Sequence, residues 1–469
     1  MGILSSTVGD ISKLLRWETV VGIFLIALLF KSWNHGKTDE KSGIPHAELV
    51  PYHLPLGLDM AWNLITRLRS NTFVEYVCDE LLNTRGRTVE MKLLGKNIFI
   101  TDRAENIKAI QADQFVDFAK GQTPHDVFSS ILGDSVFTTD GDLWKTSREQ
   151  LEPHVSRVRS DDIPTAEVHM QKLLTLIKSS SPAGVDVYDV IDRFQLDLVS
   201  QVFLGESANS LDAVEPPFRK AMEELLTYNT NRLLFGGLAN LFPDWLFVPK
   251  AYRDLTRYID GLIERTLALP CNQAESKIEE EFNLVEDLVA THPNDRYLRK
   301  LDLLANVVKE TMRMYHPLGL NIREADRSVT LPVGGGPAGN GPISVSAGQT
   351  IVYSVAGLQR NKDKVGNDAN EWDPTRWEGW SPKFGDYLPF SIGPRQCPGR
   401  VFGRFQIQYV MVRLLQEFEH IEWCGFGGDA DKDEEKMKIK VELNLKCAEP
   451  VMCRFTPRKS ATAREDLRA

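Results

Sequence analysis

The residues with the clearest chemical character lie in one loop, PFSIGPRQCPGR, which spans residues 389–400. Its only cysteine, Cys397, directly precedes Pro398. The next segment carries apolar residues at helical spacing, at Phe402, Phe405, Tyr409, Val412 and Leu415. Because proline is well tolerated at the first position of a helix, the pattern predicts Cys397 at a helix N-terminus. The free N–H groups and the helix dipole at such a position favour a thiolate over a thiol.

The remainder of the loop is suited to a large, flat, anionic partner. Gly393 and Gly399 have no side chain, so the backbone can pass close to such a group. Arg395 lies two residues before the cysteine and can pair with a carboxylate. A haem fits this combination, with its iron bound by the sulfur of Cys397 and a propionate bound by Arg395. The alternative interpretation is a structural cysteine that is buried after a turn.

Five positions of the loop, Phe390-x-x-Gly393-x-Arg395-x-Cys397-x-Gly399, resemble the haem-binding loop of the cytochrome P-450 monooxygenases. The resemblance implies a haem b cofactor whose iron takes an axial thiolate from Cys397. It also implies a mainly helical fold with small β-sheets, in the α+β class. No catalytic side chain beyond the haem ligand is identified.

Two further patterns resemble haem-propionate sites of the same family. In FTTDGDLWKTSR, Trp144 and Arg148 are one helical turn apart, after a turn that is typical of a helix start. In LGLNIREAD, Arg323 occupies a position at which the family often has a propionate-binding arginine. The resemblance therefore adds these three residues to Phe390, Gly393, Arg395 and Gly399 as cofactor-binding candidates.

A second motif, Glu310-Thr-Met-Arg313, places a carboxylate and a guanidinium on one helix face. Taken alone, such a pair is most often a solvated surface pair. In the family, however, the helical glutamate and arginine are joined by a later arginine, here Arg376 in WDPTRW, in a buried network. The predicted role of this network is structural, because mutually satisfied buried charges can lock the fold near the thiolate loop.

The segments ILGDSVFTTDGDLWKTSR and FLGESANSL are similar to microsomal fungal enzymes that hydroxylate alkanes and fatty acids. This similarity implies that one oxygen atom from O2 enters an apolar small molecule. It also implies that the electrons come from an NADPH-dependent flavoprotein reductase in the same membrane. Lys145, Arg400 and Arg404 lie near the cysteine and tryptophan motifs and can form a basic docking face.

The sequence lacks the Ala-Gly-x-Asp/Glu-Thr motif that the family carries on its long central helix above the haem. The stretch from Trp144 to Glu310 is several dozen residues shorter than the family pattern, with an apparent junction near Lys300 and Leu301. Two hypotheses remain: an active monooxygenase, or a truncated or non-catalytic haem-binding relic of one. If the chain is active as it stands, Leu284–Leu304 would have to supply the distal helix.

The composition limits the function classes. A net charge of -10 argues against general nucleic-acid binding, and six cysteines without a C-x-x-C pair do not form a disulfide framework. Residues 19–30 (TVVGIFLIALLF) are apolar and uncharged, and the 20-residue stretch 14–33 is long enough to cross a membrane as a helix. No small-residue cleavage site follows, so we expect an uncleaved anchor, with an amphipathic surface helix as the alternative. The expected location is the endoplasmic reticulum, with the body in the cytosol.

These patterns predict the elements that position the chemistry. We expect an anchor at residues 1–35, a Pro/Gly-rich linker at 36–60, a haem-thiolate domain at 61–458 and a polar tail at 459–469. Alternating or β-rich runs predict strands at Val89–Leu94, Asn97–Thr101 and Thr350–Ser354. Residues 332–348 are expected to be irregular because they are rich in glycine and proline. The last segment, KIKVELNLKC...VMCRFTPR, is expected to form a hairpin.

Overall fold

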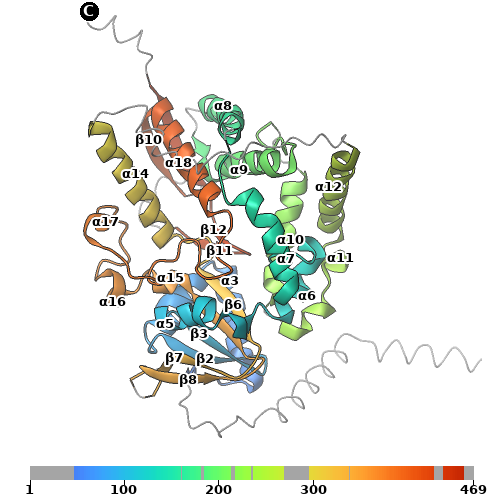
Figure 1. Cartoon of the computed structure of the whole chain (residues 1–469), viewed down its shortest axis with the longest axis vertical. Coiled ribbons are helices and arrows are strands. Elements are labelled where there is room, and N and C mark those ends of the chain that lie inside the picture. The colour runs from blue at the N-terminus through green and yellow to red at the C-terminus, as the bar shows by residue number, and fades with distance from the viewer. Residues whose placement is uncertain are drawn as a thin grey trace, which may run out of the picture.

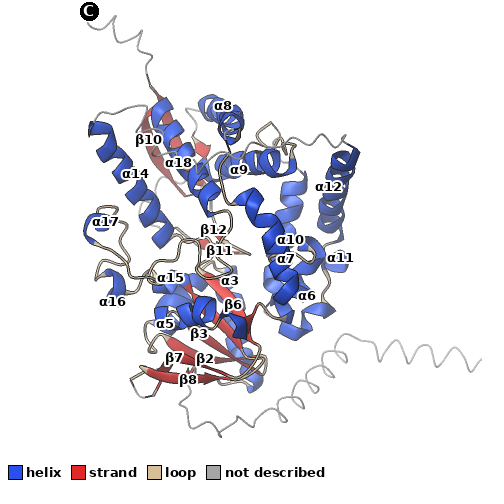
Figure 2. Cartoon of the chain, in the orientation of Figure 1, coloured by secondary structure: helices blue, strands red, loops and turns tan. Residues whose placement is uncertain are grey.

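The computed structural model describes residues 47–159, 161–180, 184–212, 217–233, 236–268, 295–336, 338–426 and 437–458. Its strands gather mainly at one end, and long helices make up most of the rest (Figure 1, Figure 2). The mixed composition agrees with the α+β class predicted from the sequence.

The helices are η2 (Pro55–Gly57), α3 (Leu58–Arg69), α4 (Phe73–Glu75), η3 (Tyr76–Leu82), α5 (Ala104–Lys108), η4 (Ala109–Asp113), η5 (Phe115–Asp117), α6 (Gln122–Leu132), α7 (Gly141–Val155), α8 (Asp162–Ser180), α9 (Val187–Leu204), α10 (Pro217–Leu233), η6 (Gly236–Leu241), α11 (Asp244–Phe247), α12 (Pro249–Ala268), α14 (Asp295–Met314), α15 (Val355–Leu358), α16 (Lys362–Val365), α17 (Arg376–Gly379) and α18 (Arg400–Glu417). Local sequence explains several ends. At α9, for example, the side chain of Asp186 accepts a hydrogen bond from the Tyr188 N–H, and Gly205 ends the helix in a left-handed conformation.

The strands are β1 (Glu48–Leu49), β2 (Thr88–Leu93), β3 (Lys96–Thr101), β4 (Phe118–Ala119), β5 (Val185–Asp186), β6 (Leu320–Ala325), β7 (Val329–Gly335), β8 (Gly341–Val345), β9 (Thr350–Ser354), β10 (Phe418–Phe426), β11 (Ile439–Val441), β12 (Leu445–Cys447) and β13 (Val451–Pro457). Six of them form a mixed sheet in the order β1-β2-β3-β9-β6-β4. The β2–β3 hairpin runs from the pair Thr88–Thr101 to the pair Leu93–Lys96. Its two turn residues, Leu94 and Gly95, both have positive φ, as the tight turn requires.

Two hydrophobic cores meet at the predicted haem loop. One core packs α8, α9 and α18 together with Phe418 and Phe455 of the β10–β13 pair. The other packs α5 and η4 against β3, β9, β7 and β8, and it includes Leu388 and Ile392. The loop that contains Cys397 therefore starts in the second core and ends in α18, which belongs to the first.

The strands predicted at Val89–Leu94, Asn97–Thr101 and Thr350–Ser354 are confirmed as β2, β3 and β9. The prediction of an irregular segment at 332–348 is wrong, because β7 and β8 pair antiparallel across it. The closest approach there requires Gly335, since a Cβ at this position would lie 2.4 Å from the Pro342 carbonyl oxygen.

The predicted C-terminal hairpin is correct only for its first part, in which β11 pairs with β12. The second part, β13, pairs instead with β10 and β5.

The expected linker at 36–60 also differs in its second half. There β1 pairs with β2 and α3 begins at Leu58, because Ala47 and Val50 are apolar and buried.

The predicted membrane anchor at 1–35 and the polar tail at 459–469 lie outside the described residues. Within the described ranges, the structure contains no helix with the length and apolar character needed to span a bilayer.

Candidate haem-thiolate site

The loop that carries Cys397 is held by its own backbone. The N–H of Cys397 donates to the carbonyl oxygen of Phe390 at 2.9 Å, and the N–H of Gln396 donates to that of Gly393 at 3.0 Å. Gly393 has a positive φ of 72°. A Cβ at Gly393 would lie 1.9 Å from the carbonyl oxygen of Gln111, so only glycine fits there. These contacts give the cysteine a fixed backbone position at the end of a tight turn.

The helix after the cysteine begins slightly later than the sequence predicts. Gly399 is the N-cap of α18 and Arg400 its first residue, so Pro398 lies before the helix and not at its first position. Burial raises the pKa of the Cys397 thiol, although the Gly399 N–H, Arg148 and Arg400 lower it. The N–H at the helix end does favour the thiolate, as predicted, but without a metal the desolvation of the charged sulfur outweighs this effect. A bound iron would favour the thiolate further, since a metal-coordinated thiol is deprotonated.

Helix α7 places Trp144 and Arg148 beside this loop. Nη1 of the buried Arg148 donates to the carbonyl oxygen of Gln396 at 2.7 Å, while Nε pairs with Glu152 at 3.0 Å. The guanidinium carbon of Arg395 lies 4.5 Å from the centre of the Trp144 ring, a cation–π contact. Trp144, Arg148, Arg395 and Cys397 are thus brought together from two segments about 250 residues apart.

Two residues that the sequence analysis did not single out complete this cluster. Asp140, the N-cap of α7, accepts from Nη2 of Arg395 at 2.5 Å and from the backbone N–H groups of Lys120 and Gly121. Burial and, to a smaller extent, the nearby cations Arg323 and Arg395 lower the pKa of Lys120 to about 7, although Asp140 opposes them. Asp140 lies in the turn predicted to start a helix, but no local pattern predicts the contacts that bring Asp140 and Lys120 near Arg395.

Arg323 reaches the same cluster from β6. It is 4% exposed, its Nη1 donates to the carbonyl oxygen of Ile322 at 2.7 Å, and its guanidinium lies over the ring of Tyr353. Within the described part of the chain, neither Arg323 nor Lys120 forms an ion pair. Burial lowers the pKa of Arg395 to about 10, which Asp140 partly opposes.

These residues fit a haem. Nε and Nη1 of Arg395 are buried and have no hydrogen-bond partner among the described residues. Asp140 pairs with one nitrogen of Arg395, while Lys120 and Arg323 have no carboxylate partner within the described residues, and buried charge without a partner is costly. The two propionates of a haem would supply two negative charges to Lys120, Arg323 and Arg395. Phe390 and Gly399 belong to the loop itself, and Gly403 lies close to the Phe390 ring.

The Glu310–Arg313–Arg376 network is buried. Arg313 donates to both carboxylate oxygens of Glu310, at 2.9 and 2.7 Å, and both side chains are 0% exposed. Nε of Arg376 lies 3.4 Å from Oε1 of Glu310, and Nε1 of Trp377 donates to the other oxygen at 3.0 Å. Burial alone would raise the pKa of Glu310, but these hydrogen bonds and charges hold it below its usual range.

Arg313 also ties α14 to the chain that leads to the cysteine loop. Its Nη1 donates to the carbonyl oxygens of Gln359 and Ala369. The side-chain oxygen of Gln359 accepts from the N–H of Leu388, directly before the loop. The network therefore supports the loop from a distance and does not contact Cys397.

The region predicted to lack a central helix lies between α12 and α14, which stand on opposite sides of α18 in Figure 1. Lys300 and Leu301, the predicted junction, lie within α14, whose backbone is helical from Asp295 to Met314. Residues 284–294 of the predicted replacement segment lie outside the described residues, and 295–304 form the first half of α14.

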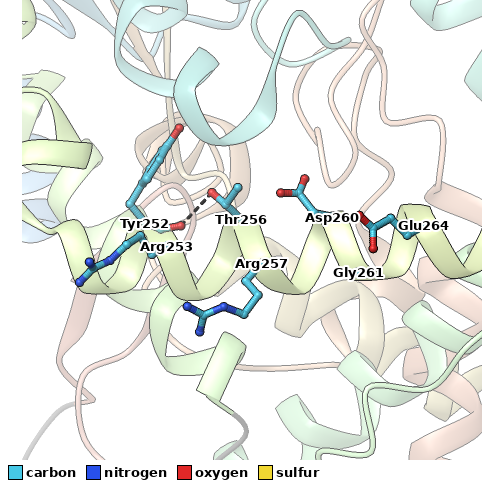
Figure 3. A pocket seen from close by; sticks show the side chains of 7 residues that line it. All are labelled: Tyr252, Arg253, Thr256, Arg257, Asp260, Gly261 and Glu264. Atoms are coloured by element: carbon cyan, nitrogen blue, oxygen red, sulfur yellow. Dashed lines mark hydrogen bonds between the residues drawn. The ribbon is translucent and has the colours of Figure 1, made fainter.

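A hollow of about 440 Å³ runs along α12, and all of its lining residues belong to that helix. Figure 3 shows Tyr252, Thr256 and Asp260 on one side of α12 and Arg257 on the other. None of these side chains belongs to the Cys397 loop or to the cation cluster. The hollow is therefore not the haem site.

The sequence matches the model of the cytochrome P-450 family over residues 53–290 and again over 269–441. Together these matches extend over most of the chain, and they include the cysteine loop and the Glu310 network. The chain belongs to the cytochrome P-450 family. The family assigns it a haem cofactor whose iron takes a cysteine thiolate, and an activity as an oxygen-incorporating monooxygenase.

The cytochrome P-450 relatives are fungal. Cytochrome P-450 monooxygenase pvhE of Talaromyces variabilis is 26% identical over 90% of this chain and 92% of the relative. Cytochrome P-450 52A1 of Candida tropicalis is 29% identical over 87% of this chain and 89% of the relative. Cytochrome P-450 52A3-A of Candida maltosa is 31% identical over 70% of this chain and 76% of the relative. The hypothesis of a non-catalytic relic is not favoured by these similarities.

Proposed function

We propose that this cytochrome P-450 inserts one oxygen atom from O2 into an apolar C–H bond of an alkane or fatty acid. The observation that carries the proposal is the Cys397 loop, in which a cysteine with a fixed backbone lies near buried Arg395, two of whose nitrogens have no hydrogen-bond partner among the described residues. The similarity of two segments to microsomal fungal hydroxylases supports the substrate class.

In this proposal Cys397 ligates the haem iron, and the haem activates dioxygen when it is bound. Phe390, Gly393 and Gly399 shape the loop against the flat macrocycle. Arg395 and Arg323 bind propionates, with Trp144 stacked on Arg395. Arg148 holds the loop through the Gln396 carbonyl oxygen and, with Lys120, adds positive charge near the propionates.

The predicted redox partner is an NADPH-dependent flavoprotein reductase. Lys145, Arg400 and Arg404 are exposed and belong to α7 and α18, the two helices nearest the cysteine loop. An exposed basic face on a chain with net charge -10 is suited to an acidic partner, because complementary charge raises the association rate. Reversing Lys145 and Arg404 to glutamate should slow reduction by the reductase, and the slowing should shrink at high salt.

We further propose that residues 1–35 anchor the chain in the endoplasmic reticulum membrane, with residues 61–458 as the haem domain in the cytosol. The apolar stretch 14–33 supports this assignment. Removal of residues 1–35 should release at least part of the protein from sedimented membranes. Complete sedimentation of the truncated chain after a high-salt wash would contradict the anchor.

We also propose that the locus encodes a longer product with a central segment inserted near Lys300–Leu301. Three observations support it: the Ala-Gly-x-Asp/Glu-Thr motif is absent, the two family matches overlap at residues 269–290, and the alignment with the Talaromyces relative has 506 positions against 469 residues here. An alignment longer than the chain contains positions that only the relative fills.

The test of the function is the absorption spectrum of the reduced protein with carbon monoxide, followed by turnover of alkanes and fatty acids with the reductase. A thiolate-type spectrum and hydroxylated product are expected from the form that contains the central segment. Binding of haem without that spectrum would contradict Cys397 as the ligand. A thiolate-type spectrum without any oxidised product would instead favour the non-catalytic relic.

A further inference from the structure

Gln111, a residue of η4, holds the start of the cysteine loop. It is 3% exposed, and its side-chain oxygen Oε1 accepts two hydrogen bonds from the loop. Oγ of Ser391 donates at 2.7 Å and the backbone N–H of Ile392 at 3.1 Å. A backbone N–H can only donate, so the amide oxygen and not the amide nitrogen must face Ile392. The orientation of the Gln111 amide is therefore fixed by the loop.

The part of the loop held by Gln111 has an unusual backbone. Ser391 has a φ of 65° and Gly393 a φ of 72°. The left-handed region is rarely populated by a residue with a side chain, so Ser391 needs outside contacts to stay there. The side chain of Gln111 supplies such contacts to Ser391 and Ile392. Its backbone carbonyl oxygen lies so close to Gly393 that a Cβ there would clash. Gln111 therefore constrains both positions.

Hydrogen bonds connect this strained start directly to Cys397. The carbonyl oxygens of Ser391 and Gly393 accept from Nε2 and N of Gln396, at 3.4 and 3.0 Å. The carbonyl oxygen of Phe390 accepts from the N–H of Cys397 at 2.9 Å. A change of conformation at Ser391–Gly393 therefore moves the backbone of the cysteine.

We propose that Gln111 is a positioning residue for the Cys397 thiolate. It fixes the backbone that carries the cysteine through its hydrogen bonds to Ser391 and Ile392. The proposal rests on the haem-thiolate ligation described above and adds a residue that no motif of the loop includes. Groups that orient a metal ligand without binding the metal themselves influence both the metal affinity and the electron donation of the ligand.

The test compares Gln111→Leu, which removes the acceptor, with Gln111→Glu, which keeps an oxygen in the same place. Gln114→Leu is the matched control, because Gln114 lies three residues further along and donates to the Thr330 carbonyl oxygen instead of to the loop. Two readouts are used on the full chain. The first is the share of thiolate-type and thiol-type spectra in the reduced, carbon-monoxide-bound form. The second is the rate at which iodoacetamide alkylates Cys397 before haem is added, resolved by peptide mass spectrometry.

Gln111→Leu should raise the thiol-type share and weaken haem binding about tenfold, in line with the usual effect of losing such a partner. Iodoacetamide should alkylate Cys397 faster in this variant, because the loop is no longer held in place. Gln111→Glu should retain most of the thiolate-type spectrum, and Gln114→Leu should match the unmodified chain in both readouts. Ser391→Ala should change both readouts in the same direction but by less, because the hydrogen bond from the Ile392 N–H to Gln111 remains. In the double variant, Ser391→Ala should change the two readouts little beyond the effect of Gln111→Leu alone.

The proposal is overturned if Gln111→Leu and Gln114→Leu behave alike in both readouts. It is also overturned if Gln111→Leu and Ser391→Ala add fully, since Gln111 would then not act through Ser391. If Gln111→Leu loses helical circular dichroism, Ser391→Ala decides by its alkylation rate alone. If the unmodified 469-residue chain binds too little haem for a spectrum, the spectra are taken on the form with the central segment, and a missing thiolate-type spectrum there means that haem ligation fails. The alkylation rates still decide the role of Gln111.

Discussion

The surroundings of Cys397 and the region between α12 and α14 differ in how many parts of the chain build them. Around Cys397, side chains from η4 and α7 bind the loop, and Lys120 and Arg323 lie near Arg395. Along α12, by contrast, a hollow of about 440 Å³ is lined by α12 alone. The residues predicted to ligate the haem are thus present in the described chain, whereas the distal acid and alcohol motif is absent from the sequence.

The largest effect is expected from Cys397→Ser. The substitution should abolish the thiolate-type spectrum, because a serine oxygen is a poor replacement for the sulfur ligand. The helical circular dichroism should change little, since Cys397 belongs to neither hydrophobic core. An unchanged reduced carbon-monoxide spectrum would remove the role assigned to the loop.

The second prediction compares the 469-residue chain with a version that contains the central segment. Expressed as 469 residues, the chain should fold poorly, take up haem weakly and fail to couple electron uptake to hydroxylation. A version with an inserted Ala-Gly-x-Asp/Glu-Thr helix near Lys300–Leu301 should bind haem fully. Transcript sequencing and the haem-to-protein ratio measure this. Normal turnover by the 469-residue protein, with no longer transcript, would show that no segment is missing.

The network behind the loop should respond strongly to loss of its shared carboxylate. Glu310→Gln removes the charge that Arg313 and Arg376 share. Arg376 keeps Asp368 as a partner, but the buried Arg313 loses its carboxylate, at a cost of about 3–5 kcal/mol in the free energy of unfolding. Chemical denaturation measures the loss. The matched control is Glu422→Gln, which breaks an exposed pair with Arg454 and should cost less than about 1 kcal/mol. Equal losses in the two variants would mean that the network has no special stabilising role.

The effect of Lys120 should appear as a gradual dependence of stability on pH. Burial and nearby cations lower its pKa from 10.5 to about 7, so between these values the unfolded chain holds one proton more than the folded chain. The stability of the chain without haem should therefore rise from about pH 7 to about pH 10 by this contribution. Propionates restore the charge of Lys120, so haem binding should take up a proton and weaken above pH 7. Lys120→Met should remove both trends in calorimetric titrations at several pH values. Trends that persist in the variant would point to a different titrating group.

The sequence was informative where the chemistry depends on a local pattern. Thr350–Ser354 was predicted as a strand and is β9. In the Cys397 loop, the arginine and both glycines lie within four residues of the cysteine, so the pattern is visible in the sequence. The helix predicted from the spacing of Phe402 to Leu415 is confirmed as α18. It buries Val410 and Leu414 in the core with α8 and α9, whereas Leu415 is exposed. Lys120, Asp140 and Gln111 could not be found from sequence, since each acts on a residue at least 20 positions away. The pairing of β7 with β8 was missed because glycine suggested a loop where it permits close backbone contact.

The position of the cysteine loop between two cores has a consequence for the order of synthesis. Gln111 precedes Ser391 by 280 residues, and Arg148 precedes Gln396 by 248. At the usual speed of translation these partners wait roughly 10–60 s for the loop to emerge. Contacts of such long range form slowly, so we expect the surroundings of the cysteine to be completed late in folding. Because Phe418 and Phe455 of the first core follow the loop in the chain, the site depends on residues made both before and after the cysteine.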